Sequence, residues 1–258
     1  MRKPIFAANW KMNKTIADTE EYIENFAKYI AEYNGNSEVV IIPPFTALAE
    51  AKKLLDLHFS DNRILLGAQN LFGEDFGAFT GEVCADMLVD AGCRYVIIGH
   101  SERRRIFNET NDLINIKIAA ALKAGLNPII CVGESKEERL EGKTFIVLEK
   151  QIPESLNFFE GDDLVEAVIA YEPVWAIGTG LTATPQQAQE AHSFIRKKIL
   201  DMFGPDLAEN KIRIQYGGSV KPENIKAIMA NTDVDGALVG GASLNPEDFF
   251  KIISFDRQ

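Results

Sequence analysis

Residues suited to acid–base catalysis recur where short apolar runs of the chain end. The stretch AYEPVWAIGTG, residues 170–180, passes from an apolar run into the carboxylate of Glu172. Asn9 and Lys11 follow the first such run, and His100 follows the fourth. A carboxylate can remove a proton, whereas imidazole and ammonium groups can stabilise negative charge that develops on oxygen. Brought together, these side chains could move a proton next to a carbonyl group.

Each of these residues also has an interpretation that involves no catalytic role. Lys11 alone would be a solvated surface charge, and Glu172 alone could cap a loop. His58 and His192 fall in helical or loop segments away from the run ends, so we expect them to be structural. His100 stands instead at a predicted strand-to-helix turn, where helix-start amides disfavour an imidazolium and favour a neutral ring.

Glycine pairs follow the last two apolar runs and could let the backbone approach a phosphate closely. They are Gly217-Gly218, which precede Ser219, and Gly240-Gly241. Glycine pairs are also common in turns, so each pair alone is weak evidence. The arginine run at 103–105 could form another phosphate site, but its position favours ion pairing on a helix surface or between subunits.

The elements that must position these residues are short continuous apolar runs. All but the run at 212–216, which reads IRIQY, lack an alternation of polar with apolar residues, and this is typical of parallel strands covered on both faces. Eight such runs are present: Ile5 to Ala8, Val39 to Ile42, Ile64 to Leu66, Tyr95 to Ile98, Pro128 to Val132, Ala167 to Tyr171, Ile212 to Tyr216 and Gly236 to Val239.

Helix signals separate the apolar runs. Thr184 and Gln187 match a capping box around Pro185, and similar starts occur at Asn245-Pro246 and near Pro222. Eight strand–helix units predict a single (β/α)8 TIM-barrel domain over residues 1–258, with an open doubly wound sheet as the alternative. The polar residues would then share the carboxyl-terminal rim, where barrel enzymes carry their active sites.

Composition excludes several classes of partner. The formal net charge of -11 and the isoelectric point near 4.9 argue against binding to nucleic acid or to an anionic membrane. Cys84, Cys93 and Cys131 are odd in number and lack zinc-ligand spacing, which predicts reduced thiols in a cytoplasmic protein. No apolar run is long enough to span a bilayer.

Seven motifs occur in an order that resembles the triosephosphate isomerase family. They are ANWKMN, GAFTGE, GHSERR, CVGE, AYEPVWAIGTG, YGGSV and GALVGGASL. The resemblance implies an isomerase of glycolysis and gluconeogenesis that interconverts dihydroxyacetone phosphate and D-glyceraldehyde 3-phosphate by proton abstraction through an enediolate. It implies no metal and no organic cofactor.

The same resemblance assigns roles to individual residues. Glu172 would be the general base, His100 a neutral electrophile, Lys11 the fixed cation and Asn9 a hydrogen-bond donor. Asn9 and Lys11 would also bind substrate. The phosphate binders would be Gly178, Ser219, Gly240 and Gly241, and the supporting residues Ser101, Glu102 and Cys131.

The rest of the 170–180 stretch resembles the family's lid over the active site. Residues 173–175 would form one hinge, residues 176–179 the moving tip, and the segment from Gly180 the second hinge. The family commonly continues GTGK, whereas this chain reads GTGL, with Leu181 at the second hinge. We expect this departure to affect lid motion rather than the chemistry.

The loop at 69–82 is unusually apolar for an exposed segment. It carries Leu71, Phe72, Phe76 and Phe79 among glycines, which predicts that something covers it. The loop could pack under its own barrel. In the family it enters a second subunit, where its threonine, here Thr80, reaches the partner's site, so the resemblance implies a homodimer.

Two other functions fit parts of the sequence. A phosphosugar aldolase-type barrel would use Lys11 to form a Schiff base, and borohydride trapping with substrate would reveal it. A non-catalytic barrel would only bind metabolites or proteins, although every position expected for catalysis is filled. The small phosphorylated triose is therefore the substrate that the sequence favours.

Overall fold

Eight parallel strands close into a barrel in chain order. The computed structural model describes residues 2–31, 33–59, 63–177 and 182–257. Each strand pairs with the next one along the chain, and the last pairs with the first. The strands are β1 (Ile5–Asn9), β2 (Glu38–Ile42), β3 (Ile64–Ala68), β4 (Tyr95–Ile98), β5 (Asn127–Val132), β6 (Val168–Tyr171), β7 (Arg213–Tyr216) and β8 (Gly236–Val239). All eight predicted strands are confirmed.

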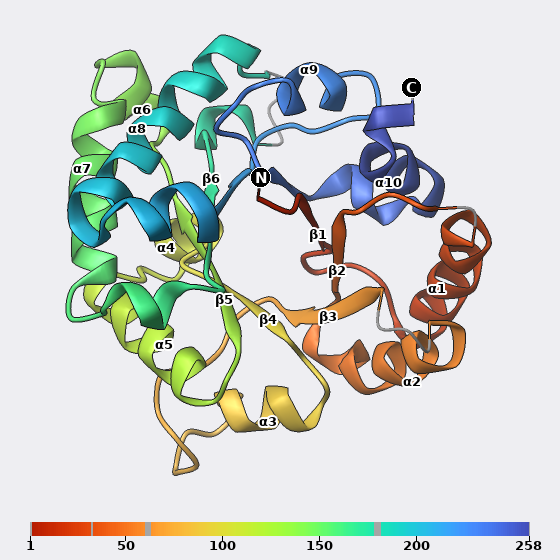
Figure 1. Cartoon of the computed structure of the whole chain (residues 1–258). Coiled ribbons are helices and arrows are strands. Elements are labelled where there is room, and N and C mark those ends of the chain that lie inside the picture. The colour runs from red at the N-terminus through yellow and green to blue at the C-terminus, as the bar shows by residue number, and fades with distance from the viewer. Residues whose placement is uncertain (1, 32, 60–62, 178–181, 258) are drawn as a thin grey trace.

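Helices surround the barrel on its outside (Figure 1). The α-helices are α1 (Ile16–Ile30), α2 (Leu48–His58), α3 (Ala85–Asp90), α4 (Ser101–Ile106), α5 (Asn111–Lys123), α6 (Lys136–Leu140), α7 (Thr144–Leu156), α8 (Pro185–Phe203), α9 (Ile225–Met229) and α10 (Pro246–Ile253). Short 3-10 turns are η1 (Phe45–Ala47), η2 (Gly161–Leu164), η3 (Val174–Ala176), η5 (Gly241–Leu244) and η6 (Phe255–Arg257), and η4 (Leu207–Lys211) is a π-helical turn.

Two of the three predicted helix starts lie where the sequence places them. The Thr184 hydroxyl accepts the backbone N–H of Gln187, and the Gln187 side chain accepts the N–H of Thr184. The side chain of Asn245 caps α10 by accepting the backbone N–H groups of Glu247 and Asp248. Residues 222–224 instead form a turn, and α9 begins only at Ile225. A proline fixes one backbone angle, but it does not by itself start a helix.

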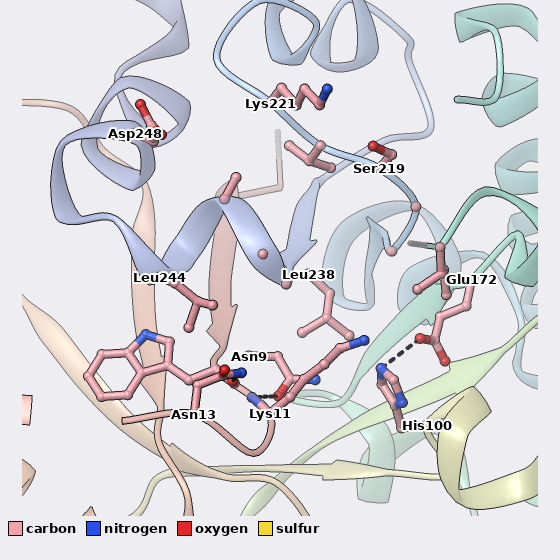
Figure 2. Close-up of a pocket in the computed structure, with 18 of the residues that line it drawn as sticks. Asn9, Lys11, Asn13, His100, Glu172, Ser219, Lys221, Leu238, Leu244 and Asp248 are labelled. Atoms are coloured by element: carbon pink, nitrogen blue, oxygen red, sulfur yellow. Dashed lines mark hydrogen bonds and ion pairs between the residues drawn. The ribbon is translucent and has the colours of Figure 1, made fainter. Parts of the chain in front are cut away.

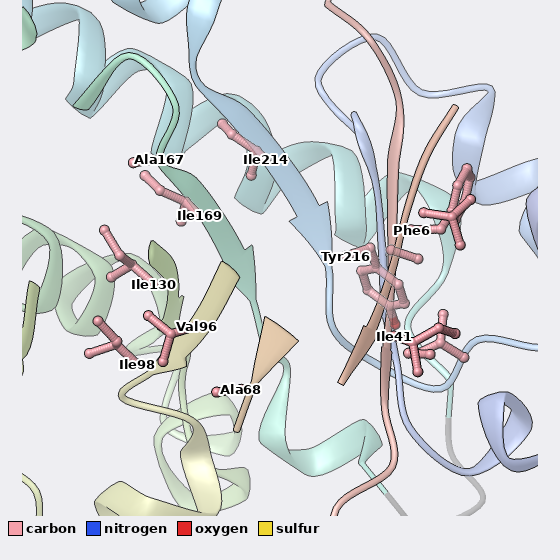
Figure 3. Close-up of a cluster of buried hydrophobic side chains, with 14 of the residues drawn as sticks. Phe6, Ile41, Ala68, Val96, Ile98, Ile130, Ala167, Ile169, Ile214 and Tyr216 are labelled. Carbon is pink, nitrogen blue, oxygen red and sulfur yellow. The ribbon is translucent and has the colours of Figure 1, made fainter. Parts of the chain in front are cut away.

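Both faces of the barrel wall are buried, which explains the continuous apolar runs. Along β1, Ile5 and Ala7 belong to the cluster inside the barrel, whereas Phe6 and Ala8 belong to the layer under the helices. Figure 3 shows this outer layer, with side chains from several strands pointing toward the surrounding helices. Since successive residues of a strand meet different apolar layers, most strand positions favour an apolar side chain. The exception is β7, in which the buried Arg213 and Gln215 alternate with apolar residues.

The two ends of the barrel differ in character. At the amino-terminal end, Arg213 donates to the Glu38 carboxylate and to the Tyr95 hydroxyl, both over 2.9 Å. This buried polar cluster closes that end with paired charges. Because the strands are parallel, their carboxyl ends all meet at the opposite rim, and the loops there surround the cavity described next.

Candidate active site

Residues at or just after the carboxyl ends of five strands line one cavity at the carboxyl-terminal rim. The cavity measures about 500 Å³ and is bordered by Asn9, Lys11, His100 and Glu172 together with the loops after β7 and β8. In Figure 2, Glu172 and His100 lie together on one side, Asn9 and Lys11 face them, and Ser219 lies at the far end. Closure of the barrel thus brings together the residues that the sequence singled out.

Lys11 is held in an uncommon backbone conformation. Its φ angle is 54°, in the left-handed region that non-glycine residues rarely adopt. Its N–H donates to Asn9 Oδ1 over 3.1 Å, and Gln69 Nε2 donates to its carbonyl oxygen over 2.8 Å. Its Nζ lies 2.5 Å from Glu102 Oε1. Backbone hydrogen bonds on both sides therefore fix the point from which the ammonium group reaches into the cavity.

His100 caps α4 and faces Glu172. Its Nδ1 accepts the backbone N–H of Glu102 over 3.2 Å, so the neutral ring carries its proton on Nε2. Nε2 lies 2.9 Å from Glu172 Oε1. Burial opposes the imidazolium, but the Glu172 carboxylate outweighs burial and raises the pKa of His100. The expected helix-start amide is present, yet the nearby carboxylate acts in the opposite direction.

Glu172 is almost completely buried, and both of its carboxylate oxygens accept hydrogen bonds. Ser101 donates its N–H to Oε2 over 2.8 Å and its hydroxyl to Oε1 over 3.3 Å. Burial alone would raise the pKa of this carboxyl, but the contacts with His100 and the Ser101 amide hold its pKa below the usual range. In this arrangement Glu172 is a weaker base than a free carboxylate, because several donors stabilise its charged form.

Glycines let the loops after β7 and β8 run close to these groups. A Cβ on Gly217 would lie 2.9 Å from Glu172 Cγ, so no side chain fits there. Gly240 and Gly241 line the cavity beside Lys11, and η5 begins at Gly241. Ser219 lines the same end of the cavity. Exposed amides near an ammonium group can hold a phosphate.

The lid-like stretch is anchored by a buried carboxylate that the sequence reading did not single out. Glu134 is fully buried and accepts from Trp175 Nε1 over 2.8 Å and from the Tyr171 hydroxyl over 3.0 Å. Its position in the CVGE motif, directly after β5, was the available signal. Ile177 lines the cavity. Gly178 and Leu181, expected to bind phosphate and to form a hinge, lie outside the described residues.

The remaining predicted residues do not line the cavity. Cys131 is completely buried inside the barrel wall, and the other two cysteines are also buried free thiols. Thr80 is exposed on the 69–82 loop and does not line the cavity of its own chain. His58 ends α2 on the surface, whereas His192 is buried in α8 behind Tyr171 and Tyr216.

In the described ranges, no group of three or more His, Cys, Asp or Glu side chains is arranged to hold a metal ion. None of the helices in the same ranges is long and apolar enough to cross a membrane.

Comparisons with known proteins agree on one family. The triosephosphate isomerase family profile matches residues 4–256. A triosephosphate isomerase of Dictyoglomus thermophilum is 53% identical, covering 98% of this chain and 99% of the relative. One of Caldanaerobacter subterraneus subsp. tengcongensis is 50% identical over 99% of this chain and 100% of the relative. A crystal structure of triosephosphate isomerase from Bartonella henselae superimposes with a TM-score of 0.87 at 40% identity, covering 100% of both chains.

The sequence motifs and the closed barrel therefore indicate the same family as these relatives do. The cavity, which holds a carboxylate, an imidazole and an ammonium group, agrees with that family. The chain belongs to the triosephosphate isomerase family, whose enzymes interconvert dihydroxyacetone phosphate and D-glyceraldehyde 3-phosphate through an enediolate.

Proposed function

We propose that Glu172 is the general base of the isomerisation, with His100 as electrophile, Lys11 as fixed cation and Asn9 as a supporting donor. The observation that carries this assignment is the 2.9 Å contact between His100 Nε2 and Glu172 Oε1 beside the Lys11 ammonium in one cavity. Removing a proton next to a carbonyl needs a base on carbon and donors on oxygen. These three side chains supply both.

The tautomer of His100 supports its role as a donor. Because Nδ1 accepts the Glu102 amide, Nε2–H is the proton that the ring can offer. In the free enzyme, the Glu172 carboxylate accepts the hydrogen bond from Nε2–H. When the carboxylate moves to the substrate carbon, the carbonyl oxygen takes its place as the acceptor, and the developing negative charge then lies between Nε2–H and the Lys11 ammonium.

Glu172 must give up its contacts with Ser101 before it can act. In the free enzyme, two donors from Ser101 and one from His100 hold the carboxylate and lower its pKa. Loss of these donors in a cavity closed to water would strengthen the base. We therefore assign Ser101 the role of holding the carboxylate between turnovers, and Glu102 that of pairing with Lys11.

The phosphate is expected to lie at the glycine-lined end of the cavity. Ser219, Gly240 and Gly241 border it, and Lys11 lies beside them. Gly178 is proposed to join them from the lid. The ion pair of Lys11 with Glu102 disfavours the Schiff-base alternative, since an ammonium group is not a nucleophile.

We further propose a homodimer through the 69–82 loop and a cytoplasmic location. Phe76 is 68% exposed and Phe79 43% exposed, although Leu71 is buried under its own barrel and Phe72 packs on Phe79 at 4.6 Å between ring centroids. A second copy would cover the exposed rings and bring Thr80 to the neighbouring site. The three free thiols fit a reducing compartment.

The replacement Glu172→Gln tests the central assignment. It keeps the shape of the side chain but cannot accept the proton, so kcat should fall roughly a thousandfold or more. Glu223→Gln is the matched control, because Glu223 is an exposed carboxylate that borders the same cavity and should be dispensable. Near-normal turnover of Glu172→Gln in a coupled assay would refute the proposed base.

A further inference from the structure

The three consecutive arginines after His100 point in different directions. Arg103 pairs with Glu109 over 2.6 Å and covers the Phe107 ring at 4.7 Å. Arg105 is exposed. Arg104 turns back under the carboxyl ends of β4 and β5. The run is therefore neither a phosphate site at the cavity nor a uniform surface patch, and the inward residue needs its own explanation.

One guanidinium joins the ends of two strands. Arg104 Nε donates to the carbonyl oxygen of Gly99 over 2.7 Å, and Nη2 donates to that of Cys131 over 2.9 Å. The β4–β5 ladder ends at the pair Ile98 and Ile130, just before these carbonyls. Arg104 thus continues the connection between the strands where their own hydrogen bonds stop.

The peptide held by Arg104 is the one that carries His100. Gly99 has a φ of 70°, and a Cβ there would lie 3.1 Å from Arg104 Nη2 and 2.7 Å from Ile114 Cδ1. The guanidinium is therefore packed against Gly99 as well as bonded to it. Since the Gly99–His100 peptide sets where the imidazole begins, a shift of this carbonyl moves the ring relative to Glu172.

Arg104 also brings charge to this position. Its third partner is the neutral Asn111, whose Oδ1 accepts from Nη1 over 2.6 Å and whose Nδ2 donates to Glu154. Among the described carboxylates, none forms an ion pair with Arg104. Its guanidinium interacts electrostatically with Glu172 and with Glu109. Lys11, Glu102, Cys131 and Arg104 interact electrostatically with Glu172 or His100, and Ser101 donates to Glu172.

We propose that Arg104 is a positioning residue for the isomerisation: it fixes the Gly99–His100 peptide against the end of β5 and so sets where the imidazole lies relative to Glu172. This inference rests on the proposed roles of Glu172 and His100. Arg104 borders neither the cavity nor the reacting atoms, so it acts through the orientation of the His100 ring against Glu172.

Two replacements separate geometry from charge. Arg104→Met removes the donors and the charge, whereas Arg104→Lys keeps the charge but cannot span both carbonyls with a planar fork. Arg105→Met makes the same change at the exposed neighbouring arginine and serves as the control. Both Arg104 variants should lower kcat on the order of tenfold to a hundredfold, with little change in KM, because the phosphate end of the cavity lies on β7 and β8.

The pH profile of kcat/KM adds a readout that loss of packing alone would not move. The contact with His100 helps to hold the pKa of Glu172 below its usual range, so displacing the ring raises that pKa. The acid limb should therefore shift to higher pH in both Arg104 variants, but not in Arg105→Met. Acid limbs in both Arg104 variants that match the parent's, or an unchanged kcat in Arg104→Met, would overturn the proposal.

Imidazole NMR of the ligand-free protein tests positioning without turnover, and so independently of the assigned reaction. The chain has 3 histidines, and His58 and His192 serve as internal references. The His100 Nε2–H signal should shift in both Arg104 variants, and a signal identical to that of the parent would refute the positioning role. If Arg104→Met does not fold, Arg104→Lys and Asn111→Leu, which removes the side-chain acceptor of Nη1, carry the same test. The isomerase activity of the unmodified protein tests the proposed function separately.

Discussion

Acidification should lower the free energy of unfolding of the enzyme through His192, a buried histidine that has no part in the proposed chemistry. Its ring lies in α8 between Tyr171 and Tyr216, with centroid distances of 5.8 and 6.3 Å. Nδ1 lies 3.3 Å from the carbonyl oxygen of Asp233, and Nε2 has no partner among the described residues. Burial lowers the pKa of His192 to about 4. The folded enzyme therefore holds this ring neutral.

The size of the effect follows from proton linkage. An unfolded histidine has a pKa near 6.5, so below that pH the unfolded chain binds a proton that the folded chain refuses. This contribution to stability is fully present above about pH 6.5 and is lost as the pH falls toward the folded pKa. With a folded pKa of about 4, the loss amounts to about 2 kcal/mol between pH 7 and pH 5.

The assay compares the free energy of unfolding in urea for the parent and for His192→Phe at both pH values and at one protein concentration. Phenylalanine keeps a ring between the two tyrosines, and Arg196 still donates to the Asp233 carbonyl. The variant should lose about 2 kcal/mol less than the parent on acidification. His58→Phe, at an exposed histidine, should behave as the parent does. Parallel pH dependence of the parent and His192→Phe would refute the reasoning.

Three further outcomes are expected. Gly133→Ala should lower kcat/KM on the order of tenfold or more in the coupled assay. The added Cβ would lie 1.9 Å from the Glu172 carbonyl oxygen and would displace the base. Full activity of this variant would contradict the close packing of Gly133 against Glu172. Thr80→Arg should shift the sedimentation equilibrium toward monomer by forcing a charge into the proposed interface; an unchanged mass where the parent is dimeric would exclude that interface. Deleting residues 177–179 should raise the amounts of inorganic phosphate and methylglyoxal released per isomerisation, since an uncovered enediolate phosphate eliminates its phosphate; a constant ratio would show that this stretch does not protect the intermediate.

The barrel could be predicted because its strands are buried on both faces. A run such as Val168–Tyr171 has no polar position, and it differs in kind from the amphipathic helices around it. Helix starts with a complete side-chain cap, such as Thr184 with Gln187, were also readable, since their signal is local. The start near Pro222 was placed too early, because the turn before α9 depends on Asn224 accepting the N–H of Lys221.

The position of the site could be predicted, but the electrostatics within it could not. Residues at strand ends must share a rim once the barrel closes, so Lys11, His100 and Glu172 were expected to meet. The direction of the pKa shifts depends on which donors Glu172 contacts, and Ser101 and His100 lie far from it in sequence. Neighbouring residues in the sequence likewise do not determine side-chain directions. The inward orientation of Arg104 and the burial of Glu134 therefore could not be predicted.

The burial of the three thiols has a consequence for an enzyme whose substrate is an aldehyde. Carbonyl electrophiles modify proteins through thiolates, and a thiolate forms only when its pKa is within reach of the surrounding pH. Burial raises the pKa of Cys93 to about 12 and places that of Cys131 well above its usual range. Cys131 lies in the barrel wall under the cavity, close to the place where the aldehyde is made. Its thiol is thus kept protonated and inaccessible, so it is protected from adding to the aldehyde to form a hemithioacetal.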